Sequence, residues 1–415
     1  MLTTMSGISL YTASWLYTPG RPPVAGGGVA FRNGRILAVG PATELVLRFG
    51  PPTADYPGCV ILPGFVNAHT HLELTRFPAW RLRGGLDYHP RRFVDWIVQV
   101  VKVRRGVSSA EVLESLKAGI AASLRAGTTC VGDIITTPDL LTGYDDSLLA
   151  GRLYLELIGQ DAASFAPRLQ QAVAAADRLA GQQRPGLSPH APYTLAAELL
   201  PGIATAASRH QLPLALHLAE SPDEDRLLFD STGALAEEFY PLVGWQGLLP
   251  PSRRTTPARF FDGGGLLGPA TLAVHCVQLN PADAALIKAR GVTICLCPRS
   301  NERLAVGQAP VYLFKKLGIP LCIGTDSLAS NDSLSLWDEL RFALDAYHGA
   351  LTPEELLQLA TVGGAHGIGL AEEIGALAEG RRADLQVVAL AGDCRAEAIL
   401  ERGRLQQVVA GGYPV

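Results

Sequence analysis

Residues 62–71 read Leu62-Pro63-Gly64-Phe65-Val66-Asn67-Ala68-His69-Thr70-His71, and the interpretation of the whole chain starts from this stretch. The apolar residues over 60–67 predict a short buried strand that ends in a His-x-His pair. Because side chains two residues apart on a strand share a face, His69 and His71 can aim at one point. Neutral imidazoles that converge in this way commonly bind a divalent transition metal. Two histidines in a surface loop are the alternative, so the rest of the chain has to supply further ligands.

Downstream of this stretch, apolar runs that predict strands alternate with segments of helical spacing. Several runs are continuously apolar, which is typical of parallel strands covered on both faces. Ser108 with Glu111, and Thr352 followed by Pro353, are typical helix starts. This alternation predicts an α/β fold, a (β/α)₈ TIM barrel. Its eight strands are expected at 60–67, 128–133, 152–158, 186–190, 213–218, 271–276, 292–297 and 320–325.

Both ends of the chain have β character. The dipeptide Asn33-Gly34 lies between two apolar runs and predicts a hairpin. Strand-like residues return from about residue 376 and could complete the N-terminal β segment. We therefore expect two domains, a small β-sandwich built from 1–58 and 376–415, and a barrel built from 59–375.

Composition narrows the class of protein. Hydrophobic residues make up 48% of the 415 residues, so a large core is easily built, and a net charge of -4 argues against nucleic acid as a partner. The 7 cysteines include no C-x-x-C pair, which favours buried thiols in a reducing compartment, with Cys295-x-Cys297 as a metal pair the weaker alternative. The chain has no secretory signal pattern and no uncharged apolar run of about 18 residues. These features predict a cytoplasmic enzyme without a membrane partner.

Two connections between predicted strands are long, at 72–107 and 219–270. Such connections are uncommon unless they are functional. Both leave C-terminal strand ends, where barrel active sites form. A helix is expected over 91–101 above this mouth. Its Phe93 and Trp96 could stack on a flat ring, although packing within the helix explains each of them equally well.

Polar side chains recur at the C-terminal ends of the predicted strands. Each one alone could be a hydrogen-bonded core residue. In a barrel, however, these ends meet at one face, and charged residues there indicate a catalytic site. The residues concerned are His69, His71, His190, His217, Glu220, His275 and Asp326.

This set of residues resembles the metal-dependent amidohydrolase superfamily. The resemblance covers the barrel and rests on Pro63 to His71, His217-x-x-Glu220, His275, Cys297-Pro298-Arg299-Ser300-Asn301 and Gly324-Thr325-Asp326. It implies one divalent metal, held by His69, His71, His217 and Asp326. Zinc is expected, with iron as the alternative. Residues 379–385 also resemble the family's composite β-sandwich.

An absent residue narrows the resemblance further. Many members of the superfamily bridge two metals with a carboxylated lysine on the fourth strand. The lysines here lie outside every predicted strand, at Lys102, Lys117, Lys288, Lys315 and Lys316. The resemblance therefore favours the mononuclear deaminase branch, whose members commonly deaminate amino-substituted purines, pyrimidines or triazines. In that chemistry Asp326 accepts a proton from water, Glu220 is the general acid, and His275 orients the attacking oxygen or stabilises its charge.

The same resemblance points to a substrate. The run His71-Leu72-Glu73-Leu74 and residues 333–341 are most similar to 6-aminodeoxyfutalosine deaminases, whose substrate carries an adenine, a ribose-derived part and a benzoate. A benzoate favours an arginine partner, for which the candidates are Arg76, Arg83, Arg299 and Arg303. For Arg303, a solvated surface position is the alternative. The expected substrate contacts are Glu73, Trp96, His190 and Arg303.

The leading hypothesis is therefore hydrolytic deamination of a 6-aminopurine nucleoside, with a small molecule as the partner. Within the superfamily, the alternatives are S-adenosylhomocysteine or methylthioadenosine deaminase, guanine deaminase and triazine hydrolase. A barrel that has lost catalysis and serves in binding or assembly is an alternative of another class. Such barrels usually lose metal ligands, whereas all four are present here. A homodimer is compatible with the sequence.

Overall fold

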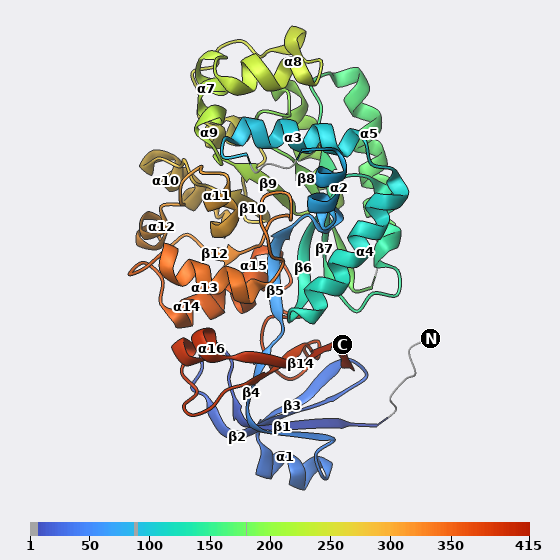
Figure 1. Ribbon diagram of the computed structural model, residues 1–415, viewed down its shortest axis with the longest axis vertical. Helices are drawn as coiled ribbons and strands as arrows, with labels where there is room; N and C mark the ends of the chain where they lie inside the picture. Colours follow the sequence, from blue (N-terminus) through green and yellow to red (C-terminus); the bar gives the residue numbers. More distant parts are fainter. Residues whose placement is uncertain (1–6, 87–89, 180) are drawn as a thin grey trace.

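The computed structural model describes residues 7–86, 90–179 and 181–415. Figure 1 shows a large part with many helices around a sheet and, below it, a smaller part that is mostly sheet. The smaller part contains the first strands of the chain together with the last ones. Two segments more than 300 residues apart in the sequence therefore build one sheet.

The large part is the predicted (β/α)₈ barrel. Its strands form an 8-stranded sheet in which β5 to β12 follow one another in chain order. All neighbouring pairs are parallel, and a bridge between Thr70 and Asp326 joins the two ends of the sheet. The strands are β5 (Phe65–Thr70), β6 (Thr128–Ile135), β7 (Ala150–Leu157), β8 (Gln183–Pro189), β9 (Leu214–Leu218), β10 (Thr271–His275), β11 (Thr293–Leu296) and β12 (Leu321–Ile323).

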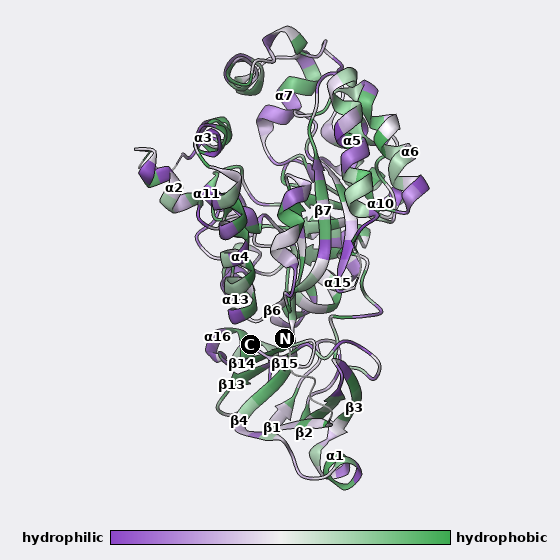
Figure 2. Cartoon of the chain, turned by 90° about the vertical axis from the view of Figure 1, so that its right-hand side faces the viewer, coloured by the Kyte–Doolittle hydropathy of each residue, from purple (hydrophilic) through white to green (hydrophobic). Residues whose placement is uncertain are grey.

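Helices surround the barrel and cover its mouth. Hydrophilic and hydrophobic residues alternate along them (Figure 2), as expected of helices with one face on a core. The helix starts expected at Ser108 and Thr352 are both present, and each has a capping box. The helices are α2 (Phe77–Arg83), α3 (Phe93–Arg105), α4 (Ser109–Arg125), α5 (Ala162–Ala176), α6 (Leu200–His210), α7 (Pro222–Asp230), α8 (Tyr240–Leu242), α9 (Pro257–Gly263), α10 (Pro281–Arg290), α11 (Pro298–Arg303), α12 (Val311–Leu317), α13 (Leu336–Ala346), α14 (Pro353–Gln358) and α15 (Gly364–Gly367).

The small part is one hydrogen-bonded 7-stranded sheet in the order β15-β14-β13-β4-β1-β2-β3. The predicted hairpin joins β2 and β3, and both Asn33 and Gly34 have positive φ, at 51° and 74°. Apolar side chains from both halves of the sheet, such as Phe31 and Val387, pack in one cluster. The elements are β1 (Ser9–Leu16), β2 (Val24–Arg32), β3 (Arg35–Pro41), α1 (Ala42–Phe49), β4 (Ala54–Pro63), β13 (Leu385–Ala389), α16 (Ala396–Arg402), β14 (Arg404–Ala410) and β15 (Tyr413–Pro414).

One strand prediction was wrong at its start. Residues 60–63, expected in the first barrel strand, belong to β4 of the small sheet, and the chain changes sheet at Gly64. A Cβ at Gly64 would lie 2.2 Å from Thr129 Oγ1, so a side chain does not fit at the crossing. The apolar run continues through this point without a break, so its pattern alone does not mark the change. We place the boundary between the two domains at Gly64 rather than after residue 58.

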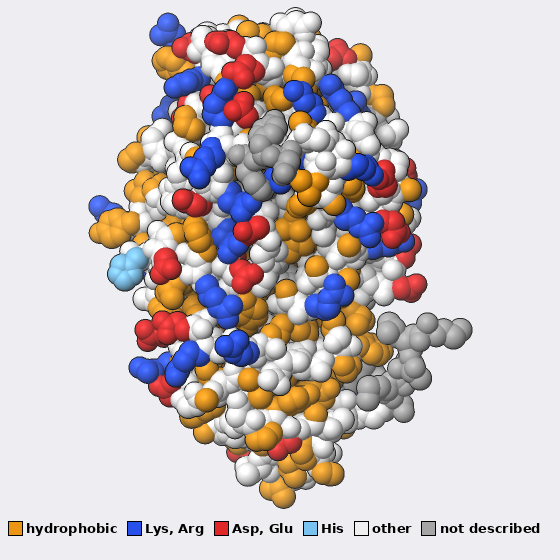
Figure 3. Space-filling view, in the orientation of Figure 1, with side chains coloured by type: hydrophobic (Ala, Val, Ile, Leu, Met, Phe, Trp, Pro, Cys, Tyr) orange, Lys and Arg blue, Asp and Glu red, His pale blue; other side chains and the backbone are white. Residues whose placement is uncertain are grey.

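On the face shown in Figure 3, Lys and Arg side chains are interspersed with Asp and Glu. Across the described ranges, every helix falls short of the length and apolar character needed to cross a bilayer.

Candidate active site

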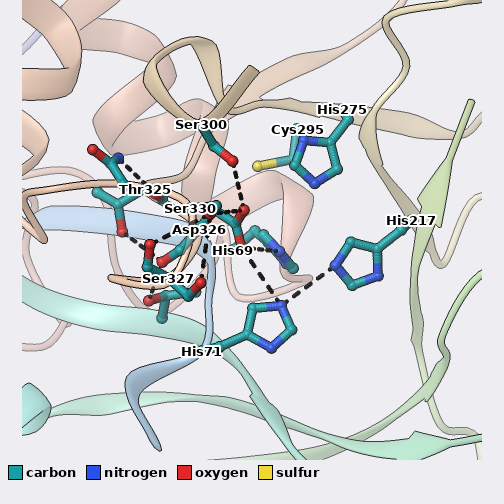
Figure 4. Close-up of polar contacts among 12 residues, drawn as sticks. His69, His71, His217, His275, Cys295, Ser300, Thr325, Asp326, Ser327 and Ser330 are labelled. Atoms are coloured by element: carbon teal, nitrogen blue, oxygen red, sulfur yellow. Dashed lines mark hydrogen bonds and ion pairs between the residues drawn. The ribbon is translucent and has the colours of Figure 1, made fainter. Parts of the chain in front are cut away.

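Four ligand-type side chains meet at the mouth of the barrel (Figure 4). The Asp326 Oδ1 atom lies 3.5 Å from His69 Nε2 and 3.6 Å from His71 Nε2. The Nε2 atoms of His71 and His217 lie 3.3 Å apart. His69 and His71 therefore share one site with a histidine from β9 and a carboxylate that follows β12.

Backbone contacts fix Asp326 beside the His-x-His segment. The amide of Asp326 donates to the carbonyl oxygen of His69 at 3.1 Å, and Thr70 Oγ1 donates to the carbonyl oxygen of Asp326 at 2.9 Å. The Asn67 side chain donates to Thr325 Oγ1 at 2.7 Å and accepts from the amide of Thr325 at 3.0 Å. A Cβ at Gly324 would lie 2.6 Å from the carbonyl oxygen of His69, so glycine allows this close approach. These contacts hold the ends of the first and last barrel strands together at the site.

The donor set fits a divalent transition metal. Burial, followed by the neighbouring His69, lowers the pKa of His71 to about 3, and burial also lowers the pKa of His217 well below its ordinary value. The His217 Nδ1 atom lies 3.0 Å from the carbonyl oxygen of His190, so Nδ1 donates and Nε2 is left with a lone pair. Within the described ranges, both ring nitrogens of buried His69 have no hydrogen-bond partner. Three imidazoles and one carboxylate are a usual ligand set for zinc and similar ions.

Two hydroxyl groups orient the fourth ligand. Ser300 Oγ and Ser330 Oγ donate to Asp326 Oδ2 at 2.7 Å and 2.5 Å, which leaves Oδ1 directed at His69 and His71. Burial alone would raise the pKa of Asp326, but the neighbouring histidines hold it well below its ordinary value. Asp326 is therefore an ionised carboxylate that can bind a cation and accept a proton.

Glu220 and His275 lie beside the ligand cluster and face each other. Glu220 Oε1 lies 3.6 Å from His275 Nε2, and in the described part of the chain neither atom has a hydrogen-bond partner. Burial, followed by Asp326 and Glu224, raises the pKa of Glu220 well above its ordinary value. His275 Nδ1 lies 2.9 Å from Asn301 Oδ1, which makes Nδ1 the donor and Nε2 an acceptor. Glu220 can thus donate a proton, and His275 can accept a hydrogen bond.

A cavity of about 350 Å³ opens over these residues. Helix α3 supplies an apolar wall with Ile97, Val100 and Val101, and Phe239 and Trp245 from the connection after β9 supply another. Both long connections therefore line the mouth, and the helix expected over 91–101 is α3. Of the residues expected to contact metal or substrate, the cavity is lined by His71, Glu73, Trp96, His190, His217, Glu220, His275 and Asp326.

The expected substrate contacts occupy different places. Both carboxylate oxygens of Glu73 accept from Thr136, whose amide lies 3.1 Å away and whose hydroxyl lies 2.9 Å away. Trp96 Nε1 donates to the carbonyl oxygen of Ala329 at 3.0 Å. His190 Nδ1 lies 2.9 Å from Thr194 Oγ1. These three side chains are held in place and keep one face toward the cavity.

Arg303 lies outside this cavity. It lines a neighbouring pocket that shares Trp96, and its guanidinium pairs with Asp332 at 2.8 Å. Arg299 pairs with the same carboxylate, and Arg83 pairs with Glu111 at 2.5 Å. Arg303 was expected to contact the substrate because it follows the predicted seventh strand. Helix α11 carries it around to the next pocket.

Arg104 lines the cavity, although it was not among the arginines expected from the sequence. Its Nη2 atom lies 3.8 Å from Glu73 Oε1. The signal was present, because residues 97, 100, 101 and 104 share one helix face. The predicted helix ended at 101, whereas α3 continues to Arg105.

Glu156 is a second missed residue. It lies at the end of β7, lines the cavity, and its Oε1 atom is 3.9 Å from His190 Nε2. Burial raises the pKa of Glu156 to about 8. The rule that selected the polar residues at the other strand ends would also have selected this one.

The lysines all lie on helices, namely Lys102 on α3, Lys117 on α4, Lys288 on α10, and Lys315 and Lys316 on α12. A carboxylated strand lysine, which would hold a second metal, is therefore missing. We expect elemental analysis of active protein to give one divalent metal per chain. Two metals per chain in fully active protein would contradict this expectation.

Comparison with known proteins agrees with this geometry. A sequence profile described as the Amidohydrolase family matches residues 60–415. An aminodeoxyfutalosine deaminase from Deinococcus radiodurans is 31% identical over 381 residues, which cover 87% of this chain and 85% of that relative. A 5-methylthioadenosine/S-adenosylhomocysteine deaminase from Syntrophobacter fumaroxidans is 32% identical over 376 residues, which cover 87% and 80%. A crystal structure of an adenosine deaminase from Xanthomonas campestris with bound zinc has a TM-score of 0.82 at 26% identity and covers 98% of this chain and 92% of that one.

Proposed function

The chain belongs to the amidohydrolase family and is a hydrolytic deaminase, and within that class we propose that it deaminates a 6-aminopurine nucleoside, 6-aminodeoxyfutalosine. The observation that carries the proposal is the position of Glu220. Its buried carboxyl group lies beside the four ligand-type residues. It also lines a cavity that has room for a molecule larger than a free base. The resemblance to the superfamily noted in the sequence is confirmed.

We assign the metal to His69, His71, His217 and Asp326, with zinc as the ion. When bound, such an ion supplies a water that ionises near neutral pH, because it lowers the pKa of water from 15.7 to about 7. The protein's own residues then direct the remaining chemistry. Asp326 Oδ1, oriented by Ser300 and Ser330, accepts the first proton of the attacking water.

The acid and the orienting group follow from the same geometry. The neutral Glu220 carboxyl donates its proton to the ring nitrogen next to the carbon that carries the amino group. His275 Nε2 accepts a hydrogen bond from the attacking water and holds it against that carbon. The carbon–oxygen bond forms as the ring nitrogen is protonated. General-acid catalysis of this kind contributes about 10²–10⁴-fold in rate.

Collapse of the tetrahedral intermediate balances the reaction. Asp326 returns its proton to the amino group, the carbon–nitrogen bond breaks, and ammonia leaves. The new hydroxyl group gives its proton to Glu220 as the ring carbonyl forms. The product keeps one proton on the ring nitrogen, and both carboxyl groups regain their starting states.

Three features support a nucleoside with an anionic tail. Of two relatives of similar identity, one is named an aminodeoxyfutalosine deaminase and the other a 5-methylthioadenosine/S-adenosylhomocysteine deaminase. The apolar walls from α3 and from the connection after β9 suit an aromatic or thioether group. Arg104, with Glu73 as its one ion-pair partner among the described residues, suits a carboxylate. We propose Glu73, Trp96 and His190 as further substrate contacts, and Arg104 in the role expected of Arg303.

A substrate panel tests this assignment. We expect kcat/KM for 6-aminodeoxyfutalosine to exceed the values for methylthioadenosine, adenosine, adenine and guanine by about 10²-fold or more, because a substrate without the carboxylate cannot form the charge-assisted pair with the half-buried Arg104. Arg104→Met should lower kcat/KM for 6-aminodeoxyfutalosine by a similar factor and leave methylthioadenosine within about threefold.

The variant Arg303→Met is the matched control, since Arg303 lies outside the cavity. It should leave both substrates unchanged. If methylthioadenosine or S-adenosylhomocysteine is the best substrate, the second relative's activity replaces the first as the assignment. A free base as the best substrate would contradict the nucleoside assignment altogether.

A further inference from the structure

The direction of the Glu220 side chain is unexpected for its place in the chain. Strand β9 ends at Leu218, and its His217 points into the barrel. By the two-residue period of a strand, Ala219 would share that face and Glu220 would point outward. Glu220 nevertheless lines the same cavity as His217. The strand geometry alone therefore does not place the general acid.

The backbone at Ala219 accounts for the difference. Ala219 has φ of 50°, in the left-handed region that residues with a side chain seldom adopt. This turn follows directly after β9 and redirects the next side chain into the barrel mouth. The carbonyl oxygen of Ala219 accepts from the amide of Gln278 at 2.8 Å. A strained turn of this kind persists only where its surroundings hold it.

The carboxyl group of Glu224 holds the turn. Its Oε2 atom accepts from the amide of Ala219 at 3.1 Å. Its Oε1 atom accepts from the amides of Glu220 at 2.7 Å and Ser221 at 3.2 Å. Glu224 is fully buried at the third position of α7, so water cannot replace these contacts. One side chain thus satisfies three consecutive N–H groups around the general acid.

We propose that Glu224 is a positioning residue for the deamination, which holds the backbone turn that aims Glu220 into the cavity. It does not line the cavity, so it acts through Glu220. The test of this inference by activity rests on the proposed function, whereas its test by crystal structures does not.

Two other helices provide matched controls. Glu111 and Glu355 occupy the same third position in α4 and α14 and accept from the N-terminal cap residue of their helix, from Ser108 N at 3.0 Å and Thr352 N at 2.8 Å. Both are partly exposed surface residues remote from the cavity lining. A Glu→Gln change at either alters a capping carboxylate at the start of a helix without touching the turn after β9.

The activity experiment compares Glu224→Gln and Glu224→Ala with Glu111→Gln and Glu355→Gln. Glutamine keeps one acceptor oxygen but turns an amino group toward the Ala219 amide, and alanine removes all three contacts. We expect kcat to fall by about 10-fold in the glutamine variant and about 10²-fold in the alanine variant, since misplacing a catalytic group by 1 Å can cost that much. KM should stay within about threefold, with one metal per chain retained. The two control variants should keep the wild-type kcat.

Crystal structures of wild type and Glu224→Gln give a second measurement that does not depend on the substrate. We expect the Glu220 carboxyl group to leave the cavity in the variant. A wild type inactive on the panel together with a displaced Glu220 would defeat the proposed function and support this inference. The inference is overturned if Glu220 keeps its place in the variant, or if kcat falls no further than in the controls. Should the alanine variant fail to fold, the glutamine variant alone decides between these results.

Discussion

Replacing Glu220 with glutamine is expected to lower kcat by about 10²–10⁴-fold while the protein stays folded and keeps one metal per chain. The glutamine side chain has nearly the same shape, but its amide cannot deliver a proton to the ring nitrogen. Glu220 has no hydrogen-bond partner on Oε1 among the described residues, so the change breaks few contacts that stabilise the fold. Ammonia release, elemental analysis and thermal unfolding measure the three quantities separately.

The exposed Glu198 on the helical segment after β8 is a matched control, because Glu198→Gln makes the same chemical change away from the cavity. That variant should match the wild type in all three measurements. Near-normal turnover in Glu220→Gln would move the acid role to another residue. Loss of metal together with activity would show that Glu220 is a ligand.

Replacing Asp326 with asparagine is expected to remove both activity and tight metal binding. The amide carries no negative charge and offers one acceptor where the carboxylate uses two. If its oxygen keeps the hydrogen bonds from Ser300 and Ser330, its amino group faces His69 and His71. The opposite orientation places the amino group against two hydroxyl donors. Either arrangement loses a contact that the carboxylate makes.

Ser330, one of the two serines that orient Asp326, provides a comparison for this result. Ser330→Ala removes one hydrogen bond to the ligand, and losses of that kind cost about 10–100-fold in metal affinity or activity. Asp326→Asn should exceed that loss in both kcat/KM and metal retained after dialysis against a chelator. An Asp326→Asn protein that binds metal as tightly as Ser330→Ala would exclude Asp326 from the ligand set.

The barrel and the meeting of the four ligand-type residues could be predicted because their signals are local or periodic. The alternation of apolar runs with helical spacing places the eight strands, and the two-residue period places His69 and His71 on one face. Ligands at strand ends then meet, because parallel strands of a closed sheet present the same edge. None of these inferences needs the position of a particular loop.

The cavity wall could not be predicted in the same way. Arg104 reaches the site because α3 lies across the barrel mouth, and that position depends on packing against residues such as Tyr193 and Phe239, far away in the sequence. Arg303 follows a strand end as the ligands do, yet α11 turns it into the neighbouring pocket. Sequence spacing gives the face of a helix but not the direction in which that helix leaves the strand.

At the turn after β9, sequence pattern and tertiary contacts again decide different features, here within a few residues of each other. The His-x-x-Glu spacing predicts that Glu220 takes part in the deamination, but a regular strand would point its side chain away from the four ligand-type residues. The left-handed backbone at Ala219, held by Glu224 and by the amide of Gln278, reverses that direction. Residue types and their period decide which groups are available to the site. Contacts between elements distant in the chain decide which of those groups face one another, because only they can stabilise a backbone conformation that is locally unfavourable.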